Sequence, residues 1–167
     1  MSWSSIPGAI LVLFTNDSLA NVNAEWVKPS LVSIYNHEIQ VAEKDEKIYS
    51  SNFFKSSYDL SKKNNNVAII GGGDGGVARE CISKNFSFVD WYELDPEVVD
   101  VCNKHLGDIG KKATEKNSVK CVWGDAFESI KSVKDDTYDH IFVDLNDDQF
   151  CIDLTAKNMD SMIRILN

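Results

Sequence analysis

The sequence predicts a doubly wound α/β fold, in which helices cover both faces of a mostly parallel sheet. A short apolar run at residues 67–70 leads into a glycine-rich loop at residues 71–76, and a helical pattern begins at Val77. Strand, glycine loop and helix N-terminus in this order form the nucleotide cradle of such folds. Strand and helix patterns continue to alternate downstream, which is typical of parallel βαβ units. The length of 167 residues suits one such domain with at most a small appendage.

The first 45 residues are predicted to form a small region of β-strands, and residues 46–167 to form the nucleoside-binding domain. Apolar runs at residues 10–14 and 31–35 lie between turn-prone segments. This pattern is typical of a β-hairpin or a small cluster of strands.

Helices are expected on both sides of the glycine loop. A polar helix should begin near Glu43, and its apolar side should consist of Ile48, Phe53, Phe54 and Tyr58. Asp95 and Pro96 show the pattern of a helix N-cap followed by proline at the first helical position. The buried stripe of that helix should consist of Val98, Val101, Cys102 and His105 or Leu106. A final amphipathic helix is expected over residues 153–166, and further strands over residues 86–93, 119–123 and 138–144.

Asp74 distinguishes the glycine loop from a typical dinucleotide-binding loop. Gly71, Gly73 and Gly76 satisfy the G-x-G-x-x-G spacing that places a pyrophosphate on the helix N-terminus. A carboxylate about 4 Å from a phosphate would be repelled by roughly 4 kcal/mol at an effective dielectric near 20, whereas a cation would be attracted by a similar amount. The loop therefore favours a nucleoside that carries a positive charge. The other interpretation is that Asp74 simply caps the helix, and this residue alone leaves both open.

Acidic residues follow or close four of the predicted strands, namely Asp74, Glu93, Asp125 and Asp144. Ligands of doubly wound sheets bind beyond the carboxyl ends of the strands. Glu93 lies about 20 residues beyond the glycines, where an acidic residue accepts hydrogen bonds from ribose hydroxyls. Asp125 could accept a hydrogen bond from an adenine amino group, cap its helix in a capping-box pattern, or do both.

Asp144 also has two interpretations. It could belong to a solvated turn, or it could lie beside Asp74 and help to form a negative pocket. Such a pocket can hold a cationic amine and accept its proton. An alkylamine keeps its proton up to about pH 10, so desolvation and a nearby carboxylate are needed to make it a nucleophile.

Composition narrows the class of protein. The net charge of −9 argues against nucleic-acid binding and suits small cationic substrates. The four cysteines form no C-x-x-C pair and the three histidines show no ligand spacing, which favours free thiols and no metal site. The apolar run at residues 9–14 is too short to cross a membrane and follows no basic residue. A cytoplasmic protein is therefore expected.

Four segments together resemble the polyamine aminopropyltransferases, the family of spermidine and spermine synthases. They are I-I-G-G-G-D-G-G at residues 69–76, Y-E-L-D at residues 92–95, G-D-A at residues 124–126, and the segment at residues 39–49 that resembles the family's junction between a small β-domain and a Rossmann-like domain. The resemblance runs from about Ile39 to Asp147. It implies a Rossmann-like, methyltransferase-type fold and a dimer.

The resemblance also implies that the chain binds decarboxylated S-adenosylmethionine and transfers its aminopropyl group to putrescine or spermidine, without a metal. Glu93 would bind the ribose, Asp125 the adenine and Asp74 the aminopropyl amine. Asp144 would be the base for the attacking amine. The other residues implied are Tyr49, Asp147 and Gln40 on the polyamine side, and Gly71, Gly73, Gly75 and Ala126 on the nucleoside side.

Several features depart from the family pattern. Residues 144–148 read D-L-N-D-D where D-S-S-D-P is usual, Ser50 stands where a histidine often follows the tyrosine, and the upstream S-x-Y-Q segment is missing. The sheet is expected to be incomplete at its C-terminal side, leaving strand 138–144 as an uncovered edge. A partner could cover this edge, or the chain could be a fragment or a degenerate homologue.

Two alternative functions follow from these departures. One is a catalytically inactive homologue that acts as a binding or regulatory subunit, as a homodimer or with a full-length family member. The other is an S-adenosylmethionine-dependent methyltransferase, which shares the fold but normally lacks an acid at the position of Asp74. A dehydrogenase ranks below both because Asp74 would repel its pyrophosphate.

Overall fold

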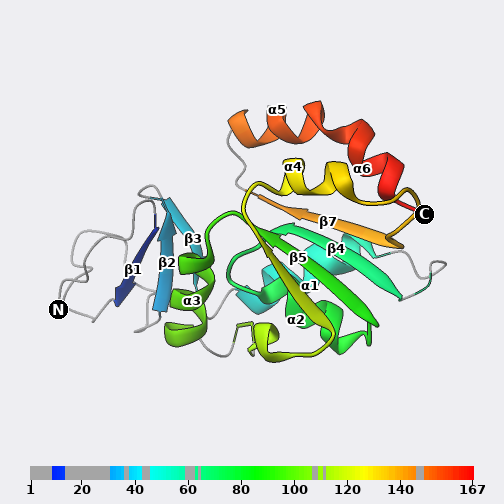
Figure 1. The fold of residues 1–167 in the computed structure, drawn as a ribbon. Helices are drawn as coiled ribbons and strands as arrows, with labels where there is room; N and C mark the ends of the chain where they lie inside the picture. Colours follow the sequence, from blue (N-terminus) through cyan, green and yellow to red (C-terminus); the bar gives the residue numbers. More distant parts are fainter. Residues whose placement is uncertain are drawn as a thin grey trace.

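A four-stranded parallel sheet forms the centre of the computed structural model (Figure 1). Its strands are β4 (Asn66–Gly71), β5 (Phe88–Glu93), β6 (Val119–Trp123) and β7 (His140–Asp144). Their spatial order is β6-β5-β4-β7, so the chain moves outward from β4 to β6 and then returns to the other side of β4. The predicted doubly wound, mostly parallel α/β fold is confirmed. The crevice at such a reversal is where these sheets bind ligands.

The structure describes part of the chain: residues 9–13, 31–35, 38–42, 46–58, 63, 65–106, 109–110, 112–145 and 149–167.

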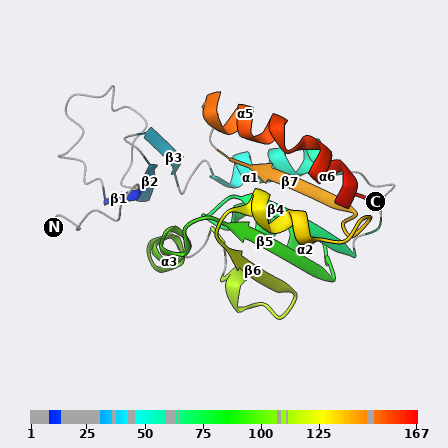
Figure 2. The same cartoon turned by 45° about the horizontal axis from the view of Figure 1, so that its top comes forward.

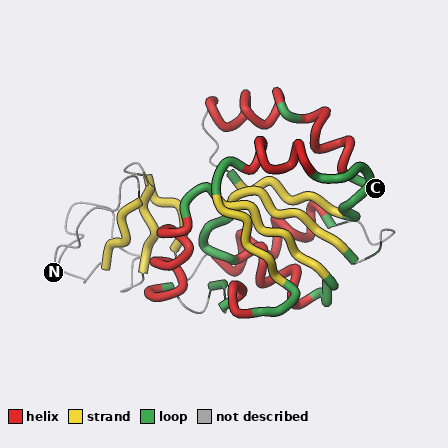
Figure 3. Tube along the Cα trace, in the orientation of Figure 1, coloured by secondary structure: helices red, strands yellow, loops and turns green. Residues whose placement is uncertain are grey.

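Two layers of helices cover the sheet, as the strands and helices of Figures 2 and 3 show. The helices are α1 (Glu46–Ser57), α2 (Gly76–Ser83), α3 (Pro96–His105), α4 (Ala126–Ser129), α5 (Gln149–Lys157) and α6 (Met159–Ile165). Two 3-10 turns, η2 (Ala113–Glu115) and η3 (Ile130–Ser132), complete these layers.

The alternation of side chains along β4 explains the two layers. Val67 and Ile69 are buried in one cluster with residues of α1, α2 and α3. Ala68 and Ile70 are buried in a second cluster with residues of α4, η3 and α6. Because successive side chains of a strand point to opposite faces, the short apolar run of β4 fills both cores at once.

A second sheet precedes the first one in the chain. Its antiparallel strands are β1 (Ala9–Leu13), β2 (Leu31–Tyr35) and β3 (Glu38–Ala42), in the order β1-β2-β3. The β-hairpin or strand cluster predicted there is present as three strands. Whether residues 1–45 behave as a separate unit stays a prediction.

Some boundaries and burials differ from those predicted. The expected final helix is divided at Asn158, whose side-chain amide donates to the Leu154 carbonyl and whose own N–H donates to the same carbonyl. Ile48 is 65% exposed and does not belong to the buried side of α1. In α3 the buried residues are Val99 and Cys102, followed by Leu106 at the C-cap. Val98 and Val101, both predicted for the buried stripe, are only partly buried, because the helix turns Val99 toward the core instead.

The outer edge of β7 has no strand partner among the described residues. Among the described strands only β4 pairs with it, in the register that places Gly71 opposite Asp144. At the start of β7, Tyr138 donates to the Ile165 carbonyl and accepts from the Asn167 N–H, so residues 165–167 run alongside it in a parallel bridge. Within the parts of the chain that are described, every helix is too short or too polar to span a membrane.

Candidate functional site at the reversal of the sheet

The glycine loop and Asp144 are in direct contact at the reversal of the sheet. The Gly72 N–H donates to the Asp144 carbonyl over 2.8 Å. Gly72 has a φ of +66°, and a Cβ there would lie 2.9 Å from Asp144 Oδ2. Trp91 Nε1–H donates to the Gly71 carbonyl over 2.8 Å and holds the loop from β5. Glycine is thus required here by the backbone conformation and by the closeness of the carboxylate.

Asp74 occupies the turn between β4 and α2. Its Oδ1 accepts a hydrogen bond from the Gly76 N–H over 2.8 Å, so it satisfies one backbone donor of the helix N-terminus. The pKa of Asp74 is raised from 3.8 to about 7, chiefly by burial and with smaller contributions from the carboxylates of Asp144 and Glu46, while this hydrogen bond lowers it. Arg79 acts in the opposite direction. The residue at the N-cap of α2 is Gly75, and Asp74 stands one position before it and accepts the first N–H of the helix. Asp74 also lies near the carboxylates of Asp144 and Glu46, and its role toward a cationic nucleoside stays a prediction.

Glu93 closes β5 on the same side of the sheet. Its Oε1 accepts the N–H of Asp95 over 3.1 Å, and its Oε2 lies 3.1 Å from where a Cβ on Gly73 would be. Burial raises the pKa of Glu93, and the nearby charges of Asp95 and Asp144 act in the same direction. Glu93 therefore lies against the glycine loop, as its position in the sequence predicted.

Tyr49 reaches Asp144 from the first helix. Its hydroxyl donates to Asp144 Oδ1 over 2.8 Å, and its ring stacks on Phe53 with the ring centroids 5.9 Å apart. The side chain of Tyr49 is 50% exposed, so the pair lies at the open side of the crevice. The fold thus brings together two residues that lie 95 positions apart in the chain, and their roles toward a polyamine stay predictions.

Asp125 and Ala126 lie one strand further out. The Gly124 N–H donates to the Glu93 carbonyl over 2.9 Å, which places this turn beside the end of β5. Asp125 Oδ1 accepts the N–H groups of Phe127 and Glu128, so the capping role is present. The adenine-binding role of Asp125 stays a prediction.

Two other predicted residues lack a described side chain. Gln40 lies on β3, at the point where the pairing of β2 with β3 shifts register. Asp147 falls at residues 146–148, outside the described residues.

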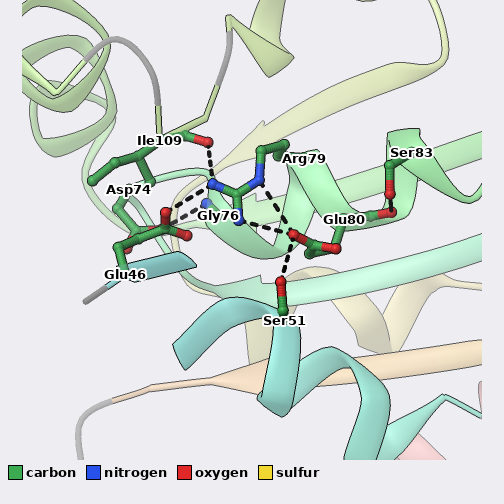
Figure 4. Close-up of polar contacts among 8 residues, drawn as sticks. All are labelled: Glu46, Ser51, Asp74, Gly76, Arg79, Glu80, Ser83 and Ile109. Atoms are coloured by element: carbon green, nitrogen blue, oxygen red, sulfur yellow. Dashed lines mark hydrogen bonds and ion pairs between the residues drawn. The ribbon is translucent and has the colours of Figure 1, made fainter. Parts of the chain in front are cut away.

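Sequence reasoning missed the charged group beneath the loop. Arg79 of α2 donates to Glu46 of α1 and to the Ile109 carbonyl, each over 2.8 Å, and to Glu80 over 2.9 Å (Figure 4). Arg79 and Glu46 are 8% and 2% exposed. A charged residue inside the apolar face of the predicted helix could have indicated such a buried pair.

The described residues contain no group of three or more His, Cys, Asp or Glu side chains arranged to hold a metal ion. The four cysteines are free thiols, and Cys81 and Cys102 are buried. Burial raises the pKa of the Cys102 thiol to about 12, with the charges of Asp74 and Glu93 adding to the effect. Cys102 is therefore an uncharged neighbour of the acidic pocket.

Comparisons with known proteins agree with the geometry. The Spermine/spermidine synthase domain model matches residues 46–167. Polyamine aminopropyltransferases from Prochlorococcus marinus strains MIT 9312 and MIT 9215 are 38% and 35% identical over 105 residues, covering 62% of this chain and 37% of each relative. The chain therefore spans well under half the length of these relatives.

Two solved structures share the fold. A spermidine synthase in complex with the transition-state analogue AdoDATO superposes with a TM-score of 0.72 at 22% identity, and the spermidine synthase from Thermotoga maritima with 0.74 at 23%. Each superposition covers 82% of this chain and 46% of the other. The family model covers most of the chain, and the glycine loop, Glu93 and Asp144 meet at one edge of its sheet. The chain therefore belongs to the spermine/spermidine synthase domain family.

Proposed function

We propose that this chain binds decarboxylated S-adenosylmethionine and transfers its aminopropyl group to an amine of putrescine or spermidine. The observation that carries the proposal is the meeting of Asp74, Glu93 and Asp144 at the reversal of the sheet, with Gly72 and Gly73 against their carboxylates. A concentration of acids around a nucleoside-type glycine loop suits a nucleoside with cationic groups. The donor has two, a sulfonium and a primary ammonium.

The donor would be held by residues at the ends of three strands. Glu93 would accept hydrogen bonds from the ribose hydroxyls, Asp125 from the adenine amino group, and Asp74 would pair with the ammonium group. The nucleoside would lie against the backbone of the loop, because Gly71, Gly73 and Gly75 carry no side chain. The small side chain of Ala126 would leave room for it at the next turn. Removal of the donor's carboxylate matters because Asp74 and Asp144 would repel it.

Asp144 would act as the general base. The attacking amine nitrogen would form a bond to the propyl carbon next to sulfur as the C–S bond breaks. Before the attack, Asp144 would accept a proton from the ammonium of the polyamine, which gives the nitrogen the lone pair it needs. The electrons of the broken C–S bond would go to sulfur, which leaves neutral methylthioadenosine, and the new secondary amine would keep its two remaining protons as an ammonium. Tyr49 would fix the orientation of Asp144 through its 2.8 Å hydrogen bond. Gln40 and Asp147 would contact the polyamine.

The assembly and location of the protein are part of the proposal. In the described part of the chain no strand pairs with the outer edge of β7, and this supports association with a second copy or with a full-length family member, because uncovered edges favour pairing. We place the protein in the cytoplasm, and we treat residues 1–45 as a small β-region and residues 46–167 as the nucleoside-binding domain.

The test compares three nucleosides by isothermal titration and then assays turnover. Decarboxylated S-adenosylmethionine should bind at least about tenfold more tightly than S-adenosylmethionine, since a repulsion of about 1.4 kcal/mol already gives that factor. Asp74→Asn should weaken this preference, leaving only the part due to Asp144, while binding of uncharged methylthioadenosine changes little. Equal affinities for the two sulfonium nucleosides in the wild type would contradict the proposal. Selective binding without release of methylthioadenosine in the presence of putrescine or spermidine would favour the non-catalytic alternative.

A further inference from the structure

A buried ion pair lies directly beneath the glycine loop. The Arg79 guanidinium donates to three segments: to Glu46 at the start of α1, to the Ile109 carbonyl after α3, and to Glu80 on its own helix (Figure 4). Glu80 also accepts a hydrogen bond from the Ser51 hydroxyl over 3.2 Å. One cation thus joins α1, α2 and the segment after α3.

These segments are the ones that press on the loop. A Cβ on Gly76 would overlap Ser50 Oγ and Glu46 Oε1, and a Cβ on Gly75 would lie 2.9 Å from Gly110 Cα. Gly110 in turn lies against the Asp74 carbonyl and directly follows Ile109, which Arg79 holds. The backbone on both sides of Asp74 therefore rests on groups that Arg79 ties together.

Within the described part of the chain, Glu46 Oε1 and Ser50 Oγ are buried without a hydrogen-bond partner. The ion pair uses the other carboxylate oxygen, Oε2. Glu46 therefore keeps an unshared negative oxygen against Gly76, whose N–H is bonded to Asp74. An unsatisfied buried oxygen destabilises the protein, so its presence points to a role in the site.

We propose that Glu46 and Arg79 are positioning residues that hold the glycine loop from beneath and set the charge of Asp74, and thereby the affinity for the cationic end of the ligand. The role in ligand binding rests on the proposed function, whereas the effect on Asp74 does not. The two residues of the pair have opposite effects on Asp74, because the negative charge of Glu46 opposes its ionisation and the positive charge of Arg79 favours it.

Of the other charged groups near Asp74, Asp144 at the end of β7 raises the pKa of Asp74, as Glu46 does. Cys102 of α3 is an uncharged thiol near both Asp74 and Glu93. Among the described groups that influence the charge of Asp74, Arg79 is the single cation. Removing either partner of the pair should therefore shift the ionisation of Asp74, and the two removals should shift it in opposite directions.

The experiment measures the titration of Asp74 by its side-chain carboxyl ¹³C signal in the ligand-free protein, assigned with Asp74→Asn. In Arg79→Met the midpoint should rise by about one pH unit, and in Glu46→Gln it should fall by a similar amount, as expected for a charge several ångströms away at an effective dielectric near 20. The double variant should return close to the wild-type midpoint. Ser50→Ala is the matched control, because it alters the same helix surface without changing a charge.

A merely structural role gives a different result. Arg79→Met and Glu46→Gln would then both loosen the loop and move the midpoint in the same direction, or leave it in place, and either outcome overturns the inference. If Arg79→Met does not fold, Glu46→Gln, the double variant and Arg79→Lys still decide the question. Arg79→Lys retains the cation and should keep the midpoint closer to the wild type than Arg79→Met does.

A second readout ties the pair to the ligand. The ratio of affinities for decarboxylated S-adenosylmethionine and uncharged methylthioadenosine, measured at pH 7, should fall severalfold in Arg79→Met and rise in Glu46→Gln. An unchanged ratio in both variants would overturn the role in ligand selection. If neither nucleoside binds the wild type, the proposed function fails, while the carboxyl titration still tests the effect of the pair on Asp74.

Discussion

Replacing Asp74 by asparagine should stabilise the ligand-free protein, and the gain should grow with pH. The pKa of Asp74 is raised from 3.8 to about 7 in the folded protein, chiefly by burial. The folded state therefore holds a proton that the unfolded state has released between about pH 4 and pH 7. Stability from this site is complete below pH 4 and is lost as the pH rises through 7. At about 1.36 kcal/mol per pH unit, the full loss is about 4 kcal/mol.

Urea unfolding at pH 5 and pH 8.5 measures this effect. From pH 5 to pH 8.5, the difference in free energy of unfolding between Asp74→Asn and the wild type should grow by about 2–3 kcal/mol in favour of the variant. Asparagine keeps an oxygen that can accept the Gly76 N–H, so the helix cap is preserved. Asp100→Asn, which removes a charge from an exposed position on α3, is the matched control and should show no such growth. An advantage of Asp74→Asn that is equal at both pH values would refute the reasoning.

Three further predictions concern the same crevice. Tyr49→Phe should lower the rate of methylthioadenosine release by about tenfold and leave nucleoside affinity nearly unchanged. The reason is that the variant loses the hydrogen bond to Asp144, and a hydrogen bond to a charged group contributes about 1.5–3 kcal/mol. An equal loss in nucleoside affinity would show that Tyr49 binds the donor instead. Gly72→Ala should lower the free energy of unfolding by about 1–2 kcal/mol for the left-handed backbone and by more through the contact with Asp144. Gly124→Ala is the comparison, because Gly124 also has a positive φ, of +113°, but an added Cβ there would have no atom within 4 Å. Equal losses in the free energy of unfolding for the two variants, measured by chemical denaturation, would contradict the role of the contact. Binding of decarboxylated S-adenosylmethionine at pH 7 should release about half a proton, since Asp74 is about half protonated in the free protein at that pH. Calorimetry in two buffers of different ionisation enthalpy measures the number of protons released. No release would mean that the bound amine does not ionise Asp74.

The order of elements was predictable because their signals are local. The apolar run of β4, the glycine turn and the helix of α2 follow one another directly, and the caps Asp95 and Asp125 bond to N–H groups two or three residues away. Errors arose where packing overrides local pattern. Ile48 is apolar yet exposed on α1, and the last helix breaks at Asn158 within a continuous apolar pattern.

Within the candidate site, the sequence alone identified the acids and their positions at the strand ends, because the carboxyl ends of parallel strands meet at one edge of a sheet. Tertiary structure decided which of them touch the loop. The register of β4 with β7 places Asp144 against Gly71 and Gly72. The position of α1 brings Tyr49 to Asp144 and Glu46 to Arg79, across 95 and 33 residues of chain. Such contacts depend on how whole helices pack on the sheet, and no local pattern carries that information. The charge of Asp74 depends on the same packing, because burial and the surrounding charges, rather than the residue type, raise its pKa.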